Sequence, residues 1–90
     1  MSGSCIFPGY KWCGPNCSGP GAPINDVDNC CMKHDLCLLE GKHSRYECDL
    51  MFMECLEPKV NYHTLKGRQA GLMYRFFKLK TSFNQRPPRR

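Results

Sequence analysis

Residues 28–37 read DNCCMKHDLC, and this stretch decides the fold because it places three cysteines and a His-Asp pair on one expected helix. Asn25 can cap that helix just upstream. The carboxylates of Asp26 and Asp28 suit the positive end of the helix dipole. Gly41 supplies a stop, so the sequence predicts a helix that ends at about residue 40.

A second helix follows after a short connection. Residues 44–47 read SRYE, which has the form of a capping box. The helix should run to about Leu56 and end before Pro58, because a proline disfavours helical backbone at the residue before it. Since only residues 41–44 separate the two helices, we expect them to pack antiparallel.

This geometry selects two disulfide bridges. In an antiparallel helix pair, residues at one level have position numbers with a constant sum. The positions of Cys37 and Cys48 add up to 85, and those of Cys30 and Cys55 add up to the same value. On each helix the two cysteines are seven residues apart, which is two turns along one face. We therefore predict these two interhelical bridges.

Upstream of the helices, residues 5–23 are rich in glycine and proline, which excludes a helix or a central strand and predicts a loop. Cys31 points about 100° away from the cysteine before it, so its partner must lie off the helix pair. Cys13 and Cys17 are both available in the loop, and the one left over would pair with Cys5.

Length and composition limit the class of protein. Ninety residues, 10.4 kDa, allow one small domain with a marginal apolar core. Eight cysteines favour a disulfide scaffold made in an oxidising compartment, so we predict a secreted protein, although residues 1–5 show no signal peptide. Zinc is the weaker alternative because no Cys-x-x-Cys pair occurs. Apolar runs are far shorter than the roughly 20 residues of a membrane span.

The predicted first helix carries candidate catalytic groups. His34 shares a face with the cysteines that bridge to the second helix, so its ring should face that helix too. Asp49 comes up on the neighbouring edge of the partner and could hold one imidazole nitrogen, leaving the other as a general base. Asp35 should point toward the loop, where carbonyl oxygens and a carboxylate would suit calcium. The plain alternatives are a surface His-Asp pair and a loop that only connects.

Residues 12–37 resemble the secreted phospholipase A2 family. The loop segment WCG at 12–14 fits the aromatic-Cys-Gly-x-Gly form of its calcium loop, and residues 28–37 fit the Asp-x-Cys-Cys-x-x-His-Asp-x-Cys form of its active-site helix. The second helix matches as well, so the resemblance covers about residues 10–56. It implies the bridges Cys13–Cys31, Cys30–Cys55 and Cys37–Cys48, which leaves Cys5 with Cys17.

The resemblance also implies a role for each matched residue. His34 is the general base, and Asp49 orients it. The calcium ligands are the carboxylate of Asp35 and the backbone carbonyls of Trp12, Gly14 and Asn16. The Gly14 amide assists the developing oxyanion. The implied reaction is calcium-dependent hydrolysis of the sn-2 ester of a glycerophospholipid, which releases a fatty acid and a lysophospholipid.

The sequence departs from the family pattern at several points. Asn16 stands where the family has its second loop glycine, and two extra residues follow it, one of them Cys17. Leu38 replaces a tyrosine that bonds the second-helix aspartate, and Tyr46 is the candidate substitute. No segment corresponds to the N-terminal interfacial helix or to the β-hairpin of the family. In this respect the chain is similar to the short bacterial, fungal and parvoviral members.

The charge of +5 is unevenly distributed. Residues 1–56 hold four Lys/Arg and seven Asp/Glu, a net charge of −3. Residues 57–90 hold nine Lys/Arg and one Asp/Glu, a net charge of +8.

The basic part carries a helical stripe of apolar residues: Leu65, Leu72, Phe76, Leu79 and Phe83, widened by Met73 and Phe77. Such a helix suits an anionic membrane surface, or it simply packs on the helix pair. The predicted interfacial residues are Arg68, Arg75, Phe76 and Lys78. No base-reading motif is present, so we expect no nucleic acid.

These patterns predict an all-α, disulfide-stapled fold in a single phospholipase A2-like domain over residues 1–90, acting as a monomer. Its expected segments are a calcium-binding loop (5–24), a catalytic helix hairpin (25–57), a C-terminal helical segment (58–84) and a disordered tail (85–90). Two other functions remain open. One is a catalytically silent relative that binds membranes or acts as an antimicrobial protein, and the other is a zinc-stapled interaction domain.

Overall fold

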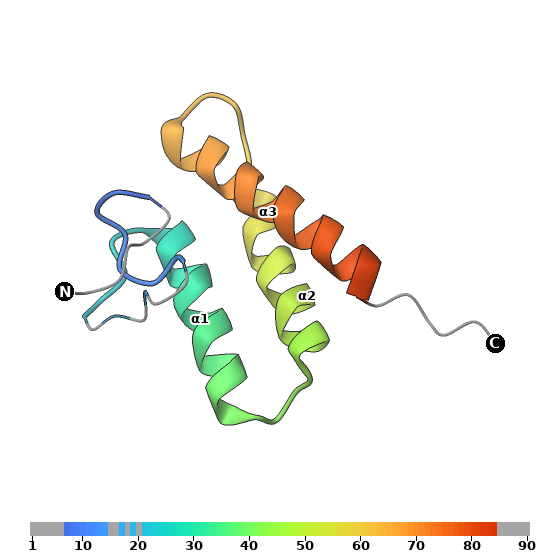
Figure 1. Cartoon of the computed structure of the whole chain (residues 1–90). Coiled ribbons are helices and arrows are strands. Elements are labelled where there is room, and N and C mark those ends of the chain that lie inside the picture. Colours follow the sequence, from blue (N-terminus) through green and yellow to red (C-terminus); the bar gives the residue numbers. More distant parts are fainter. Residues whose placement is uncertain (1–6, 15–16, 18, 20, 85–90) are drawn as a thin grey trace.

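The computed structural model describes residues 7–14, 17, 19 and 21–84 of the chain. A loop leads into helix α1 (Asp26–Glu40), which is followed by α2 (Arg45–Leu56), a short 3-10 turn η1 (Glu57–Lys59) and α3 (Leu65–Asn84). No strand occurs in these described ranges, so the all-α prediction is confirmed. Figure 1 shows α1 and α2 running antiparallel, the loop beside the start of α1, and α3 lying across α2. Within the described part of the chain, no helix is long and apolar enough to cross a membrane.

The caps predicted for the first two helices are confirmed. The Asn25 side chain accepts a hydrogen bond from the backbone N–H of Asp28 (2.7 Å), and Gly41 ends α1 in the left-handed conformation, with φ 72°. At the start of α2, the Ser44 hydroxyl accepts from the Glu47 N–H, and the Glu47 carboxylate accepts from the Ser44 N–H. The connection between the helices is therefore short and fixed at both ends.

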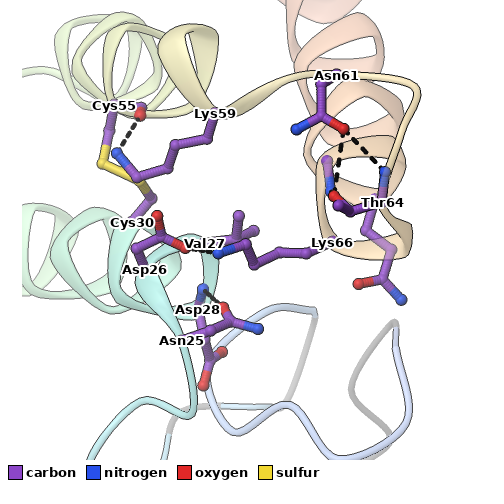
Figure 2. Close-up of polar contacts among 12 residues, drawn as sticks. Asn25, Asp26, Val27, Asp28, Cys30, Cys55, Lys59, Asn61, Thr64 and Lys66 are labelled. Atoms are coloured by element: carbon purple, nitrogen blue, oxygen red, sulfur yellow. Dashed lines mark hydrogen bonds and ion pairs between the residues drawn. A yellow bond between two sulfur atoms is a disulfide. The ribbon is translucent and has the colours of Figure 1, made fainter.

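The third helix begins at Leu65, later than the start of the expected helical segment at residue 58. A turn built by Asn61 delays it: the Asn61 side-chain oxygen accepts from the backbone N–H groups of His63 (2.8 Å) and Thr64 (3.0 Å). The Thr64 hydroxyl in turn accepts from the N–H of Gly67 (2.9 Å) and caps the new helix. Figure 2 shows Asn61 and Thr64 at this turn. A Cβ at residue 67 would lie 2.4 Å from the Asn61 side chain, so a larger residue there would displace Asn61 from this turn.

Three disulfides between described residues join the loop and the first two helices. They are Cys13–Cys31, Cys30–Cys55 and Cys37–Cys48, the same pairs that the family resemblance implies. Cys17 is also disulfide-bonded, and Cys5, its implied partner, lies outside the described residues. The bridges fix the register of α1 against α2, because both interhelical pairs lie on facing sides.

The core lies where all three helices meet. Val27 of α1 and Leu56 of α2 are completely buried, and α3 contributes Ala70 and Met73. The predicted apolar stripe of α3 is thereby divided. Met73 is buried and Phe77 is partly buried on the core, whereas four other members are 62–64% exposed: Leu65, Leu72, Phe76 and Leu79. Packing on the helix pair therefore accounts for only the smaller part of the stripe, and the side chain of Phe83 lies outside the description.

Candidate active site

The structure brings His34 and Asp49 together between α1 and α2. His34 Nε2 lies 2.7 Å from Asp49 Oδ1, and the two side chains are only 11% and 3% exposed. The proximity follows from the register that the flanking bridges impose, since each residue lies within four positions of a bridged cysteine. With the proton on Nε2 pointing at the carboxylate, Nδ1 carries the lone pair that a general base needs.

Two phenylalanines enclose the imidazole. The centre of the His34 ring lies 4.9 Å from that of Phe52 on α2 and 5.3 Å from that of Phe77 on α3. The centres of the two phenylalanine rings are 4.7 Å apart. Their apolar surfaces shield the histidine and its aspartate from water, which strengthens the hydrogen bond between them. Helix α3 is thus part of the candidate site, which sequence reasoning did not predict.

The second oxygen of Asp49 faces a lysine. Lys80 Nζ of α3 lies 3.4 Å from Asp49 Oδ2 and 4.6 Å from the centre of the Phe77 ring. The hydroxyl of Tyr46, the proposed substitute for the missing family tyrosine, makes no hydrogen bond to Asp49 among the described residues. Sequence reasoning did not assign Lys80 to the candidate site. The signal for Lys80 was its spacing of three residues from Phe77, which puts both side chains on the same face of the helix.

A cleft of about 510 Å³ opens beside the histidine. Its lining comes from the loop and all three helices: Phe7, Trp12, Gly14, Cys31, His34, Asp35, Arg45, Phe52, Leu72, Met73, Phe76, Phe77 and Lys80. The half-buried Asp35 therefore shares the cleft with Trp12 and Gly14, two of the three expected carbonyl donors. The third, Asn16, lies outside the described residues.

Asp28 anchors the loop to α1. Its carboxylate is fully buried and accepts hydrogen bonds from the backbone N–H groups of Lys11 (3.1 Å), Trp12 (2.8 Å) and Ile24 (3.0 Å). The middle of the loop, at Lys11 and Trp12, and its end at Ile24 are thus fixed to one side chain. Sequence reasoning assigned Asp28 only to the helix dipole. Its position three residues before Cys31, the cysteine that bridges to the loop, was the signal for this second role.

The donor groups at the cleft suit calcium better than zinc. Among the described residues no three His, Cys, Asp or Glu side chains form a metal cluster, so Asp35 would be joined by backbone carbonyls. The Gly14 carbonyl accepts from the Cys17 N–H (3.2 Å) and keeps a second lone pair for a cation. One carboxylate with carbonyl oxygens is the hard-oxygen set of calcium. No described cysteine is free, so the zinc-thiolate alternative is wrong for this part of the chain.

The predicted interfacial residues all lie on the exposed surface of α3. Arg68, Arg75, Phe76 and Lys78 are exposed. Phe76 also borders the cleft, together with Leu72. The exposed apolar residues of α3 therefore continue into the mouth of the cleft.

Away from the cleft, an ion pair links the starts of α1 and α3. Lys66 Nζ lies 2.8 Å from Asp26 Oδ1, and Figure 2 shows the two side chains meeting beside Val27. The hydrogen bond from Lys66 lowers the pKa of Asp26 below its usual 3.8. The pair therefore stabilises the folded chain above that pH, and its contribution is lost as the pH falls through the lowered pKa. Both groups are about half exposed, so the effect is small.

Comparison with known proteins identifies the family of the chain. The family of the phospholipase A2-like domain matches residues 4–80. Phospholipase A2-alpha of Arabidopsis thaliana is 43% identical over 67 residues, which covers 67% of this chain and 45% of that protein. The chain thus spans less than half the length of this curated relative. No solved structure gives a significant match. Because the family match covers most of the chain, the chain belongs to the phospholipase A2-like domain family.

Proposed function

We propose that the chain is a secreted, calcium-dependent phospholipase A2 that hydrolyses the sn-2 ester of glycerophospholipids. The observation that carries the proposal is the buried His34–Asp49 pair, 2.7 Å apart, beside a cleft that also holds Asp35 and Gly14. Family membership and the name of the plant relative support the same reaction class.

In the proposed reaction, His34 acts as a general base. Its Nδ1 takes a proton from a water molecule in the cleft as that water attacks the ester carbonyl. The imidazole then carries a positive charge, which the Asp49 carboxylate at Nε2 stabilises while holding the ring in place. When the tetrahedral intermediate collapses, the bond from the carbonyl carbon to the sn-2 oxygen breaks, and the imidazolium gives its proton to that oxygen, which leaves on the lysophospholipid. Phe52 and Phe77 keep bulk water from the pair, so the attacking water is the one that the cleft admits.

The residues that would hold calcium are Asp35 and the backbone carbonyls of Trp12, Gly14 and Asn16. When bound, the ion supplies positive charge for the substrate phosphate and for the developing oxyanion. The loop's contribution would be to present these carbonyl oxygens to the ion. Asp28 supports this by fixing the backbone at Lys11 and Trp12.

We further propose that α3 places the cleft on a membrane surface. Leu72, Phe76 and Leu79 are at least 62% exposed, and the exposed cations Arg75 and Lys78 lie next to them in sequence. An apolar stripe flanked by cations favours the interface of anionic lipids. A monomer suffices for this arrangement, because the proposed catalytic groups come from one chain.

The same exposed face of α3 supports a second candidate function. A protein that inserts this face into membranes without hydrolysis would act as a membrane-disturbing or antimicrobial relative. Such a protein does not need a buried His-Asp pair beside a carboxylate, and for that reason we rank hydrolysis first.

The test is ester hydrolysis on mixed phospholipid vesicles. His34→Gln should abolish fatty-acid release, because glutamine cannot act as the base, and the fold should persist because the bridges and caps are untouched. His63→Gln is the matched control: this histidine is exposed and lies at the turn before α3, away from the cleft. Circular dichroism should give the same spectrum for parent and both variants.

Calcium dependence is tested on the parent with EDTA and with excess calcium. We expect turnover with calcium and none after chelation. Activity that survives thorough chelation contradicts the calcium assignment, and a His34→Gln variant as active as the parent contradicts the catalytic assignment. Vesicle binding without turnover under either condition would favour the membrane-binding candidate.

A further inference from the structure

We propose that Lys80 is a positioning residue for the active site, acting through Asp49 rather than on the lipid. The inference deepens the proposed function and rests on it. A single carboxylate would then be held at both oxygens: Oδ1 by His34 at 2.7 Å and Oδ2 by Lys80 at 3.4 Å.

The need for such a partner follows from burial. The Asp49 side chain is 3% exposed, and a buried carboxylate is costly unless its charge is compensated. In the family that the sequence resembles, a tyrosine bonds this aspartate. Here Leu38 stands at that position and has no polar group to offer. Within the described residues, the polar contacts of Asp49 come from His34 and Lys80 alone.

The surroundings of Lys80 fix its ammonium group where it is needed. Its Nζ lies 4.6 Å from the centre of the Phe77 ring, a distance at which a cation is attracted to the ring face. The next residue, Thr81, is 8% exposed, and its hydroxyl lies 3.9 Å from the Met53 sulfur of α2. This contact seats the α3 backbone on α2 beside Asp49. Lys80 is 25% exposed, compared with 44% for Lys66 on the same helix.

Two-point attachment restricts the carboxylate plane. Without Lys80, Asp49 could rotate about its terminal bond, and its hold on the Nε2 proton of His34 would loosen. The imidazole would then sample the tautomer that protonates Nδ1, the nitrogen required to accept the proton from water. A positioning role therefore predicts loss of turnover with little change in substrate binding.

Because Lys80 also lines the cleft, contact with a lipid phosphate is the competing role. The two roles separate in kinetics on a soluble substrate, a short-chain phosphatidylcholine below its micellar concentration with saturating calcium. Loss of a positioning residue lowers kcat, whereas loss of a substrate contact raises KM. A monomeric substrate also removes any effect of membrane binding.

We would compare the parent with Lys80→Met, Lys80→Arg and Lys66→Met. Lys80→Met should lower kcat roughly tenfold, the usual effect of losing a group that orients a catalytic residue, with KM within about twofold. Lys80→Arg should recover most of the rate because it keeps the cation. Lys66→Met removes the same charge from the same helix and breaks a shorter ion pair, yet it should keep the parent kcat, because Lys66 does not line the cleft.

Nitrogen-15 NMR of His34 gives a readout that does not require turnover. The parent and Lys66→Met should show the proton on Nε2, and Lys80→Met should show a mixture of tautomers. An unchanged kcat and tautomer in Lys80→Met overturns the proposal, as does a rise in KM alone. If the parent itself does not hydrolyse the lipid, the proposed function fails, and the tautomer comparison still decides the position of Asp49.

Discussion

A single carboxylate decides the shape of the loop that faces the active-site helix. Asp28 accepts backbone hydrogen bonds from the middle of the loop, at Lys11 and Trp12, and from its end at Ile24. Hydrogen bonds to a charged acceptor are about twice as strong as neutral ones, and here the accepting carboxylate is completely buried. The hydrogen bonds of Asp28 and the Cys13–Cys31 bridge therefore both fix the conformation of the loop.

Asp28→Asn should destabilise the chain by about 2–4 kcal/mol, because the buried side chain loses its charge and one of the two oxygens that accept from the loop backbone. Urea unfolding followed by circular dichroism measures the change. The same variant should lower calcium affinity in titration, since the loop carbonyls would lose their fixed direction.

Asp26→Asn is the control for this variant. It removes an identical charge two residues away, but Asp26 is about half exposed and its ion pair with Lys66 lies at the surface, so the loss should stay below about 1 kcal/mol. Equal effects of the two substitutions would show that the buried hydrogen bonds of Asp28 are not what holds the loop.

Helix α3 has two faces with different surroundings. One face carries Met73 and Phe77 onto the core and brings Lys80 to Asp49. The other leaves Leu72 and Phe76 exposed at the mouth of the cleft. A helix used in this way couples two proposed tasks, completing the catalytic pair and meeting the lipid.

Reversing Arg75 and Lys78 to glutamate should weaken binding to anionic vesicles at least about tenfold at low salt, because each cation near such a surface adds about 1 kcal/mol. Sedimentation with vesicles of anionic and of zwitterionic lipid measures the binding. Turnover of monomeric substrate should not change. The double reversal of Lys33 and Lys42, which changes the net charge equally at exposed positions of α1 and the following turn, should weaken binding far less. Should both double variants bind alike, net charge rather than the α3 face attracts the lipid.

At the scale of the whole molecule, covalent links replace a large core. The three described bridges connect the loop to α1 and α1 to α2, while the completely buried side chains are few. In so short a chain, apolar burial alone gives a marginal fold. The bridges restrict the unfolded chain and so raise the free energy of unfolding.

Reduction should therefore unfold the protein, since each bridge contributes about 2–4 kcal/mol. Circular dichroism with and without a reducing agent measures the loss of helix. Alkylation and mass spectrometry before reduction should find no free thiol. A reduced chain that keeps its helices at 37 °C would show that packing alone is sufficient.

Local signals in the sequence predicted much of the fold, whereas contacts between segments far apart in the sequence were not predicted. The Asn25 cap, the Ser44–Glu47 capping box and the interhelical bridges depend on spacing within about one helix pair, so pattern reasoning reached them. The late start of α3 depends on the Asn61 turn, whose donors are specific backbone groups. The pairing of Lys80 with Asp49 depends on how α3 crosses α2, which no periodicity encodes.

The distribution of cross-links sets an order in which the molecule should fail. The sequence holds no cysteine after Cys55, so α3 is attached by packing, ion pairs and its short connection to η1. The hairpin that carries His34 and Asp49 is stapled, whereas the helix that carries Phe77 and Lys80 is not. Upon warming, α3 should detach first, and hydrolysis should cease while the helical signal of α1 and α2 persists. The protein would then lose activity before it unfolds. Because the disulfides preserve the register of the hairpin, activity should return on cooling.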